Sequence, residues 1–383
     1  MIDAMNSELR ISEHAYGAPK PYGREKMNYR VRLILAATFG VLAIGGPKNV
    51  VHAQEEKPPL VLNLGSETSL NFYGYAKADF IWDDGFDLGQ TTSGVKNIGL
   101  PAGGPVGSFD RQQLNETRIG FDVWGPNDLF ARFEGDFFGS NNSLRLRHAY
   151  IDWHGVIVGQ NWTNFMSVET LADTVDFQGP PGYPLSRVPQ LRYTFSGLDN
   201  IVLSGSVEED KTNSNKPTYT LAFRYGLDDG FIRVAGLYRD TVLDGSEVDG
   251  WGVNLSAVYG LWPGGKLKAN FTTGEGIADI LNAGIAGNAV IIGGRAVGVD
   301  SATLTVSHQV SDKLKFAVTG GWLNVEQSAG TDTDKLSTLH LSAFYEAFQS
   351  ATLMAEYFSG RRTQGNGARF SSDRVQVAIR YDF

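Results

Sequence analysis

The chain is dominated by segments in which apolar and polar side chains alternate one by one. In the last ten residues, every second residue from Val375 to Phe383 is apolar, and the residues between them are polar apart from Ala378. The same alternation runs through Leu129–Phe137 and Trp251–Leu261. A period of two is that of a β-strand with two different faces, and no helix has it. The pattern therefore predicts an all-β chain.

Connections between the alternating segments are short and long in turn. Seven tight turns, such as His154–Gly155 and Trp262–Gly265, separate eight longer gaps, and this order makes sixteen strands. The longer gaps are residues 84–113, 139–142, 163–188, 209–217, 241–249, 275–298, 327–335 and 362–372. An even number of strands joined in this way is typical of an outer-membrane barrel with short periplasmic turns and long outer loops. We therefore predict a 16-stranded antiparallel transmembrane β-barrel over residues 71–383.

A soluble β-sandwich also alternates, so further features are needed to place the barrel in a membrane. Strands of about ten residues match a tilted crossing of the hydrocarbon layer. Aromatic residues recur near strand ends, where interfacial girdles lie, for example Phe72, Trp82, Trp251 and Tyr259. Closure of the barrel also leaves no unpaired sheet edge in lipid.

Composition removes several other classes of protein. The longest apolar run, Leu33–Gly46, is shorter than the roughly 20 residues of a membrane-spanning helix. The chain has no cysteine, which excludes disulfides, thiolate catalysis and thiolate-bound zinc. A formal charge of −9 argues against a nucleic-acid partner. No cofactor is expected.

The N-terminal region has the order of a secretory signal peptide. Within residues 27–53, a basic stretch is followed by the apolar run and by Val51-His52-Ala53, so we expect the mature chain to begin at Gln54. Residues 1–26 form either an upstream extension or a misplaced start, and residues 54–70 a short periplasmic segment. Residues 1–53 hold seven basic and four acidic residues, so the remainder has 26 basic and 38 acidic residues, a net charge of −12.

Sixteen strands leave an aqueous channel, and alternation assigns the side chains that line it. The inward positions carry a run of basic residues, whereas most acidic residues fall in loops. The third gap, which holds Asp173, Asp176 and the rigid turn Gly179–Gly182, is expected to fold inward and narrow the channel. Arginine presents a planar fork suited to carboxylates, although Glu116, Glu134 and Asp136 share the inward face and could pair with it. The basic residues predicted to line the pore are Lys77, Arg118, Arg132, Arg145, Arg147, Arg192 and Arg224.

Strict alternation also places some polar side chains outward. If Arg145 and Arg147 face inward, then His148 and Tyr150 face outward, as does Gln160 on the following strand. Polar groups at such positions are costly in lipid and favour a protein neighbour. The pattern therefore predicts a subunit interface at His148, Tyr150 and Gln160.

Alternative functions were weighed against a channel. His340 and Ser342 lie two residues apart on one strand face, a spacing that could serve a barrel phospholipase. Alternation turns this pair inward, where a lipid substrate could not reach it, so we do not expect an enzyme. No metal site is expected from the histidine spacing. A general or sugar-type channel without anion preference is the other alternative.

Several motifs resemble one known family of channels. Residues 144–150, 158–165, 176–182 and 190–195, together with the segment 71–79, are similar to the DcaP-like trimeric outer-membrane porins of Gram-negative bacteria. The resemblance implies an outer-membrane trimer that passes small anionic solutes such as dicarboxylates. It also implies that the last strand, which ends in Phe383, is the targeting signal read by the barrel-assembly machinery. The expected partners are small anionic solutes, outer-membrane lipid and two further copies of the chain.

Overall fold

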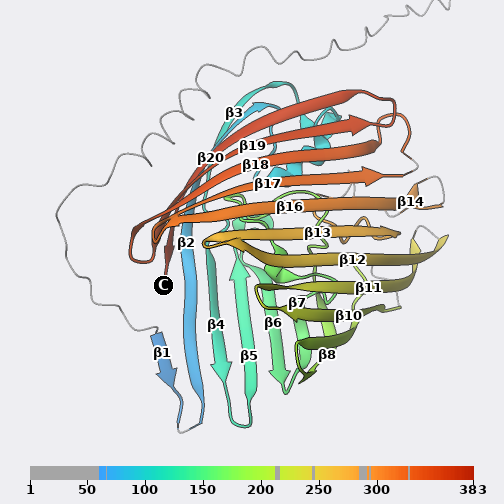
Figure 1. Ribbon diagram of the computed structural model, residues 1–383. Helices are drawn as coiled ribbons and strands as arrows, with labels where there is room; N and C mark the ends of the chain where they lie inside the picture. The colour runs from blue at the N-terminus through green and yellow to red at the C-terminus, as the bar shows by residue number, and fades with distance from the viewer. Residues whose placement is uncertain are drawn as a thin grey trace, which may run out of the picture.

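Sixteen antiparallel strands form one closed wall in the computed structural model, which describes residues 60–65, 67–211, 216–243, 246–283, 291–292, 295–326 and 328–383 (Figure 1). Each strand pairs with the next, and the wall closes where β20 (Arg369–Asp382) pairs with β2 (Ser69–Gly85). β3 (Gly107–Gln113) and β4 (Arg118–Trp124) both pair with β2 and together make the second strand. The other strands of the wall are β5 (Leu129–Asp136), β6 (Arg145–Trp153), β7 (Val156–Trp162), β8 (Arg187–Leu198), β9 (Ile201–Glu208), β10 (Thr218–Leu227), β11 (Gly230–Leu243), β12 (Ser246–Trp262), β13 (Gly265–Glu275), β16 (Gly298–Ser311), β17 (Leu314–Val325), β18 (Thr333–Phe348) and β19 (Ala351–Gln364).

The closed 16-stranded barrel confirms the predicted fold class, but strand residues extend into several of the predicted gaps. Residues 107–113, within the first gap, form β3 and pair with β2. In the gap 241–249, β11 and β12 stay paired as far as Leu243 and Ser246. Asp240 and Asp249 are opposite each other in this hairpin. These segments are polar, so the sequence pattern assigns them to loops, although their strand pairing continues through them.

Short additional elements lie at the ends of the wall. β1 (Leu60–Asn63) pairs with residues 69–72 of β2, and β14 (Ile291–Ile292) pairs with β15 (Arg295–Ala296). The 3-10 turns are η1 (Thr92–Asn97), η2 (Pro101–Gly103), η3 (Ser140–Asn142) and η4 (Val168–Thr170). None of the described helices has the length and hydropathy of a membrane-spanning helix. The predicted N-terminal extension, signal peptide and start at Gln54 lie outside the described residues.

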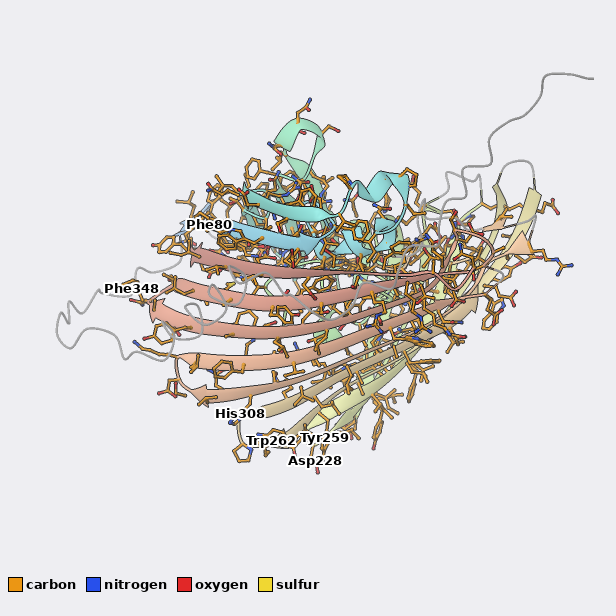
Figure 2. All side chains as sticks on the ribbon, turned by 90° about the horizontal axis from the view of Figure 1, so that it is seen from above. Phe80, Asp228, Tyr259, Trp262, His308 and Phe348 are labelled. Carbon is orange, nitrogen blue, oxygen red and sulfur yellow. The ribbon has the colours of Figure 1, made fainter. Side chains whose placement is uncertain are left out.

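The two faces of the wall differ as the alternation requires. Along β18, Leu339 is exposed on the outside, whereas His340 and Ser342 are buried inside. Tyr259, Trp262 and Phe348 point away from the wall near the short turns (Figure 2). The indole nitrogen of Trp262 donates to His308 Nδ1 at 3.2 Å, so this exposed aromatic ring still has a polar partner. Such aromatic rims are typical of barrels that sit between lipid and water.

Part of the interior is apolar rather than water-filled. Val95 and Ile98 of the connection after β2 pack with Phe165, with Ile277 and with inward residues of the wall such as Phe358. The other members of this cluster are Phe86, Leu88, Ala222, Ala235, Leu237, Ala278, Ile280, Leu281, Ala283, Val297, Val299, Leu323, Val325 and Leu336. Burial of these side chains holds three connections inside the barrel. Half-exposed inward arginines lie along β4 to β10, and one more, Arg380, lies on β20 opposite Lys77.

Candidate functional site

The inward arginines of β4 to β6 are paired with carboxylates on neighbouring strands. Arg132 lies opposite Asp122, and its Nε and Nη2 donate to the two carboxylate oxygens at 2.7 and 2.8 Å. Arg145 lies opposite Asp136 and makes the same bidentate contact with its carboxylate. Arg118 Nε is 3.6 Å from Glu134. The strand register that brings these residues opposite each other therefore neutralises most of this basic wall.

Lys77 does not face open water. Its ammonium group donates to Glu116 and to the carbonyl oxygen of Val175 at 2.7 Å, and it lies 3.2 Å from Asp79. The side chain is only 1% exposed. Lys77 therefore anchors Val175 to β2, and its side chain is almost inaccessible to solvent.

A β-bulge reverses the predicted orientation of two residues on β6. Glu134 pairs with His148 and Gly135 with Leu146, which leaves Arg147 as an extra residue. Beyond the bulge the alternation is shifted by one, so His148 and Tyr150 face the lumen together with Arg147. The His148 ring lies 5.6 Å from the Trp162 ring, and Tyr150 is opposite the inward Arg132. The prediction that His148 and Tyr150 face outward is therefore wrong.

Gln160 has a structural role at the same bulge. It lies opposite Ala149, on the outward face of β7. Its amide donates to the backbone oxygens of Leu146 and Arg147 at 3.2 and 3.1 Å. The bulge leaves these carbonyls without a regular ladder partner, and Gln160 supplies the donor. Its polarity on the outside therefore needs no neighbouring subunit.

A second set of arginines, on β8 to β11, retains free donors. Arg224 lies opposite Arg233, and the Arg224 guanidinium stacks over Phe231 at 4.2 Å. Arg192 Nε, Arg224 Nε and Arg233 Nη1 are buried and have no hydrogen-bond partner among the described residues. Arg192 and Arg224 form no ion pair there either. Sequence reasoning missed Arg233, because both faces of β11 carry apolar residues and its alternation is ambiguous.

Residues 163–186, which we call the inward loop, reach the wall on the far side of the barrel. The backbone nitrogen of Val175 donates to Glu356 at 2.7 Å, and its carbonyl accepts from Lys77. Asp173 lies 3.0 Å from Lys268 and 3.3 Å from Lys315. Burial alone would raise the pKa of Asp173, but these two ammonium groups hold it below the usual range. The inward loop therefore crosses the lumen and is tied to β2, β13, β17 and β19.

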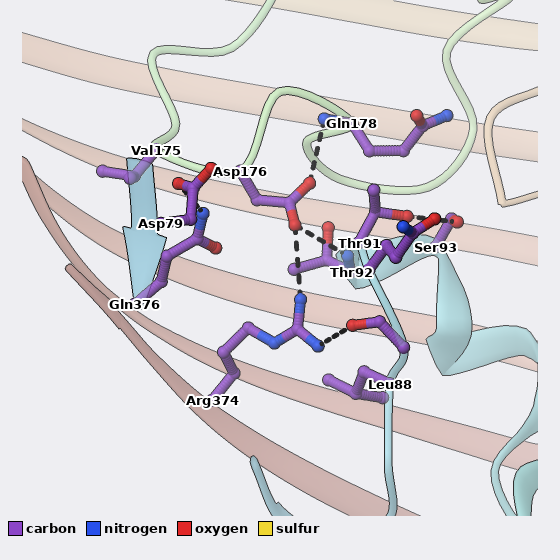
Figure 3. Close-up of polar contacts among 12 residues, drawn as sticks. Asp79, Leu88, Thr91, Thr92, Ser93, Val175, Asp176, Gln178, Arg374 and Gln376 are labelled. Atoms are coloured by element: carbon purple, nitrogen blue, oxygen red, sulfur yellow. Dashed lines mark hydrogen bonds and ion pairs between the residues drawn. The ribbon is translucent and has the colours of Figure 1, made fainter. Parts of the chain in front are cut away.

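Asp176 joins the inward loop to the connection after β2. It accepts from the backbone nitrogens of Thr92 and Gln178, both at 2.9 Å, and lies 3.4 Å from Arg374 (Figure 3). Arg374 also donates to Asp83 and to the Gly89 carbonyl. Burial raises the pKa of Asp176 to about 6, against the lowering effect of Arg374. Asp176 is therefore an anchor that titrates near neutral pH, although it was predicted to line the pore.

Lowering the pH from 7.5 to 5 is expected to increase any preference of the pore for anions, because protonation of Asp176 removes one negative charge. The permeability of each ion should change by no more than about fourfold, upward for anions and downward for cations, which is the Coulomb effect of one unit charge at roughly 5 Å in water. Reversal potentials in a salt gradient at both pH values measure it. Asp176→Asn should behave at pH 7.5 as the native protein does at pH 5. If the reversal potential changed equally with pH in the native protein and in Asp176→Asn, another group would be responsible for the titration.

His340 and Ser342 do not form a catalytic pair. Each bonds to Glu356: His340 Nδ1 lies 3.1 Å from one carboxylate oxygen, and Ser342 Oγ donates to the other at 2.7 Å. No hydrogen bond joins His340 to Ser342 among the described residues, and all three side chains are buried. Because the second oxygen of Glu356 also accepts from Val175, the cluster holds the inward loop against β19.

Phe383 completes the seam between the first and last strands. Its backbone nitrogen donates to the Gly74 carbonyl, and its carbonyl accepts from the Gly74 nitrogen, both at 3.0 Å. A Cβ atom at position 74 would lie 2.3 Å from the Arg118 carbonyl and 2.9 Å from the Phe383 ring. Only glycine fits this close approach, so Gly74 makes room for the C-terminal ring.

Comparison with known proteins identifies the family. A family model described as DcaP outer membrane protein matches residues 61–272, more than half of the chain. The chain belongs to this family. Membership and fold together make it an integral channel protein of the outer membrane, as predicted. No curated protein sequence matches the chain.

Solved structures with the same fold include a member of this family. The outer membrane channel DcaP of Acinetobacter baumannii superposes with a TM-score of 0.71 at 20% identity, over 83% of this chain and 98% of that one. OmpT of Vibrio cholerae gives 0.59 at 15%, over 84% and 100%. An anion-selective porin from Comamonas acidovorans gives 0.59 at 14%, over 83% and 100%. At these identities the likeness establishes the barrel and no finer property.

Proposed function

We propose that this outer-membrane channel lets small anions, dicarboxylates among them, diffuse in preference to cations. The unpartnered guanidinium donors of Arg192, Arg224 and Arg233 carry the proposal, because none of these three side chains forms an ion pair with a described carboxylate. Focused between low-dielectric walls, such charge attracts anions and repels cations. The Arg132 and Arg145 side chains, each more than a third exposed, offer further donor edges beside their carboxylates.

The reversal potential of the native channel tests this proposal directly. In planar bilayers with an about tenfold gradient of potassium chloride, the sign of the reversal potential should show chloride to be the more permeant ion. A potential near zero would support a general or sugar-type channel instead. Competition between chloride and a dicarboxylate such as succinate in the same bilayer then tests the solute class.

A homotrimer is the second part of the proposal, and the sequence resemblance supports it. The outward polar residues no longer place its interface on β6 and β7, because His148 and Tyr150 face the lumen and Gln160 is bonded within the chain. Recognition of the last strand by the barrel-assembly machinery is likewise proposed from the resemblance, with Phe383 as its terminal residue.

His148→Leu is expected to leave a trimer intact, because the side chain lies inside the barrel. Chemical cross-linking in mild detergent should give the same trimer band for the native protein and the variant. Val158→Arg, which places a charge on an exposed outward position of β7, is the comparison. If His148→Leu lost the trimer and Val158→Arg kept it, the subunit interface would lie at β6 after all.

A further inference from the structure

The second half of the inward loop, which we call the return arm, contains a turn that depends on a side chain from another connection. Residues 178–182 read Gln-Gly-Pro-Pro-Gly, and the two prolines have no N–H to donate. The carbonyls of Gln178 and Pro180 both accept from the amide of Asn282, at 2.6 and 2.7 Å. The Gly179 carbonyl lies 3.5 Å from the same nitrogen. One amide group therefore serves the carbonyls of Gln178 and Pro180, whereas the Gly179 carbonyl between them also accepts from the Thr92 hydroxyl at 3.2 Å.

The backbone of Asn282 continues this contact. Its nitrogen donates to the Tyr183 carbonyl at 2.6 Å, and its carbonyl accepts from the Gly182 nitrogen at 2.9 Å. Its side-chain oxygen accepts from Gln178 and from the Ala283 nitrogen. Asn282 is 3% exposed, so water cannot replace these partners. The backbone N–H and C=O of Asn282 and both ends of its side-chain amide are therefore all hydrogen-bonded.

The wall supports the opposite side of the same turn. Ser301 Oγ donates to the Gly182 carbonyl at 2.9 Å. A Cβ atom at Gly321 would lie 2.4 Å from Pro180, so the turn rests directly on the backbone of β17. The Tyr183 hydroxyl donates to the Thr170 carbonyl at 2.6 Å. This bond joins the return arm to the first half of the inward loop, which we call the outgoing arm. The exposed residues Val168 and Glu169 lie on that outgoing arm, beside Thr170.

We propose that Asn282 is the positioning residue that sets the aperture of the channel, because it clamps residues 178–183 against the wall. An amide is needed here: a carboxylate of the same shape would have no donors and would turn negative oxygens toward three carbonyls. The inference concerns the size of the aperture, which is a property separate from the anion preference proposed above.

The test is the size limit for neutral solutes in the Asn282→Asp variant. Polyethylene glycols of increasing size are added to single channels in planar bilayers, and the largest that still lowers the conductance is recorded. At pH 7.5 the variant should admit larger polymers and show frequent transitions between open levels. At pH 4.5 protonation returns one donor, so the limit should move back toward the native value. The native channel, measured at both pH values, accounts for the titration of Asp176.

Two further variants separate a specific clamp from general packing. Asn282→Ala removes the donors without adding charge, so it should raise the size limit equally at both pH values. Asn115→Asp is the matched control, because Asn115 is a buried amide that donates to Phe137 and Asn142 at 2.7 Å and so holds a different connection. This control should keep the native size limit.

A native size limit in assembled Asn282→Asp and Asn282→Ala channels would overturn the proposal, as would an equal change in Asn115→Asp. If the aspartate variant does not assemble, Asn282→Ser is used, because its hydroxyl keeps one donor. It should show an intermediate limit, and a native limit there would also overturn the proposal. Neutral polymers report on aperture alone, so a channel without anion preference would leave this result unaffected.

Discussion

Replacing Arg192 and Arg224 together by glutamine is expected to lower the ratio of anion to cation permeability about tenfold. Each substitution removes one positive charge that forms no ion pair among the described residues. A unit charge at about 5 Å changes the permeability of each ion by roughly fourfold in water, in opposite directions for anions and cations. After partial screening, removal of two charges should change the permeability ratio by about an order of magnitude. Reversal potentials in a salt gradient measure the change. Glutamine removes the charge and keeps a polar end group, although its side chain is shorter than that of arginine.

The double change Arg132→Gln with Asp122→Asn is the matched control. It also alters two inward residues, but it removes an ion pair and so leaves the net charge of the wall unchanged. The reversal potential of this control should stay close to that of the native channel. If both double variants behave alike, the preference does not come from Arg192 and Arg224, and the proposed origin of selectivity is wrong.

Arg147→Met is expected to destabilise the barrel by about 3–5 kcal/mol, the usual result of leaving buried charges without their partner. Arg147 donates to Glu134 at 2.7 Å and to Asp136 at 2.8 Å, and its side chain is only 4% exposed. Unfolding by urea in detergent micelles, followed by the loss of the folded band on a gel, measures the change.

Arg111→Met is the control for that loss. Arg111 also forms an ion pair, with Asp87 at 2.8 Å, but its side chain is 32% exposed. Such a pair contributes less than about 1 kcal/mol. Adding Glu134→Gln to Arg147→Met should restore part of the stability, because it removes one of the two stranded carboxylates. Equal losses of stability in the Arg111 and Arg147 variants would show that the buried ion pairs of Arg147 contribute no more than the exposed pair of Arg111.

The sequence by itself determined the wall of this barrel. Alternation with a period of two identifies strands because successive side chains of a strand point to opposite faces. Short turns then order the strands, and their even number leaves the first and last strands antiparallel, as their pairing requires. Parity along a regular strand also assigns Arg118, Arg132 and Arg145 to one face, the face on which they approach Glu134, Asp122 and Asp136.

Tertiary structure alone decided what those residues contact. The bulge at Arg147 inserts one residue and so reverses the faces of His148 and Tyr150; a polar run does not show in sequence where such a shift occurs. Ion pairs depend on which residues of two strands lie opposite, a register that alternation does not specify.

The lumen shows the same division most clearly. Lys77, Asp176 and Glu356 belong to the interior by sequence pattern or by loop position, but only the path of the inward loop turns them into buried anchors. Arg192, Arg224 and Arg233 keep free donors because no described carboxylate comes within ion-pair distance of them. Alternation reports only the face on which a side chain lies. The contacts that fix the inward loop join residues far apart in the chain, such as Val175 and Glu356, which are 181 positions apart, and only the folded chain brings them together.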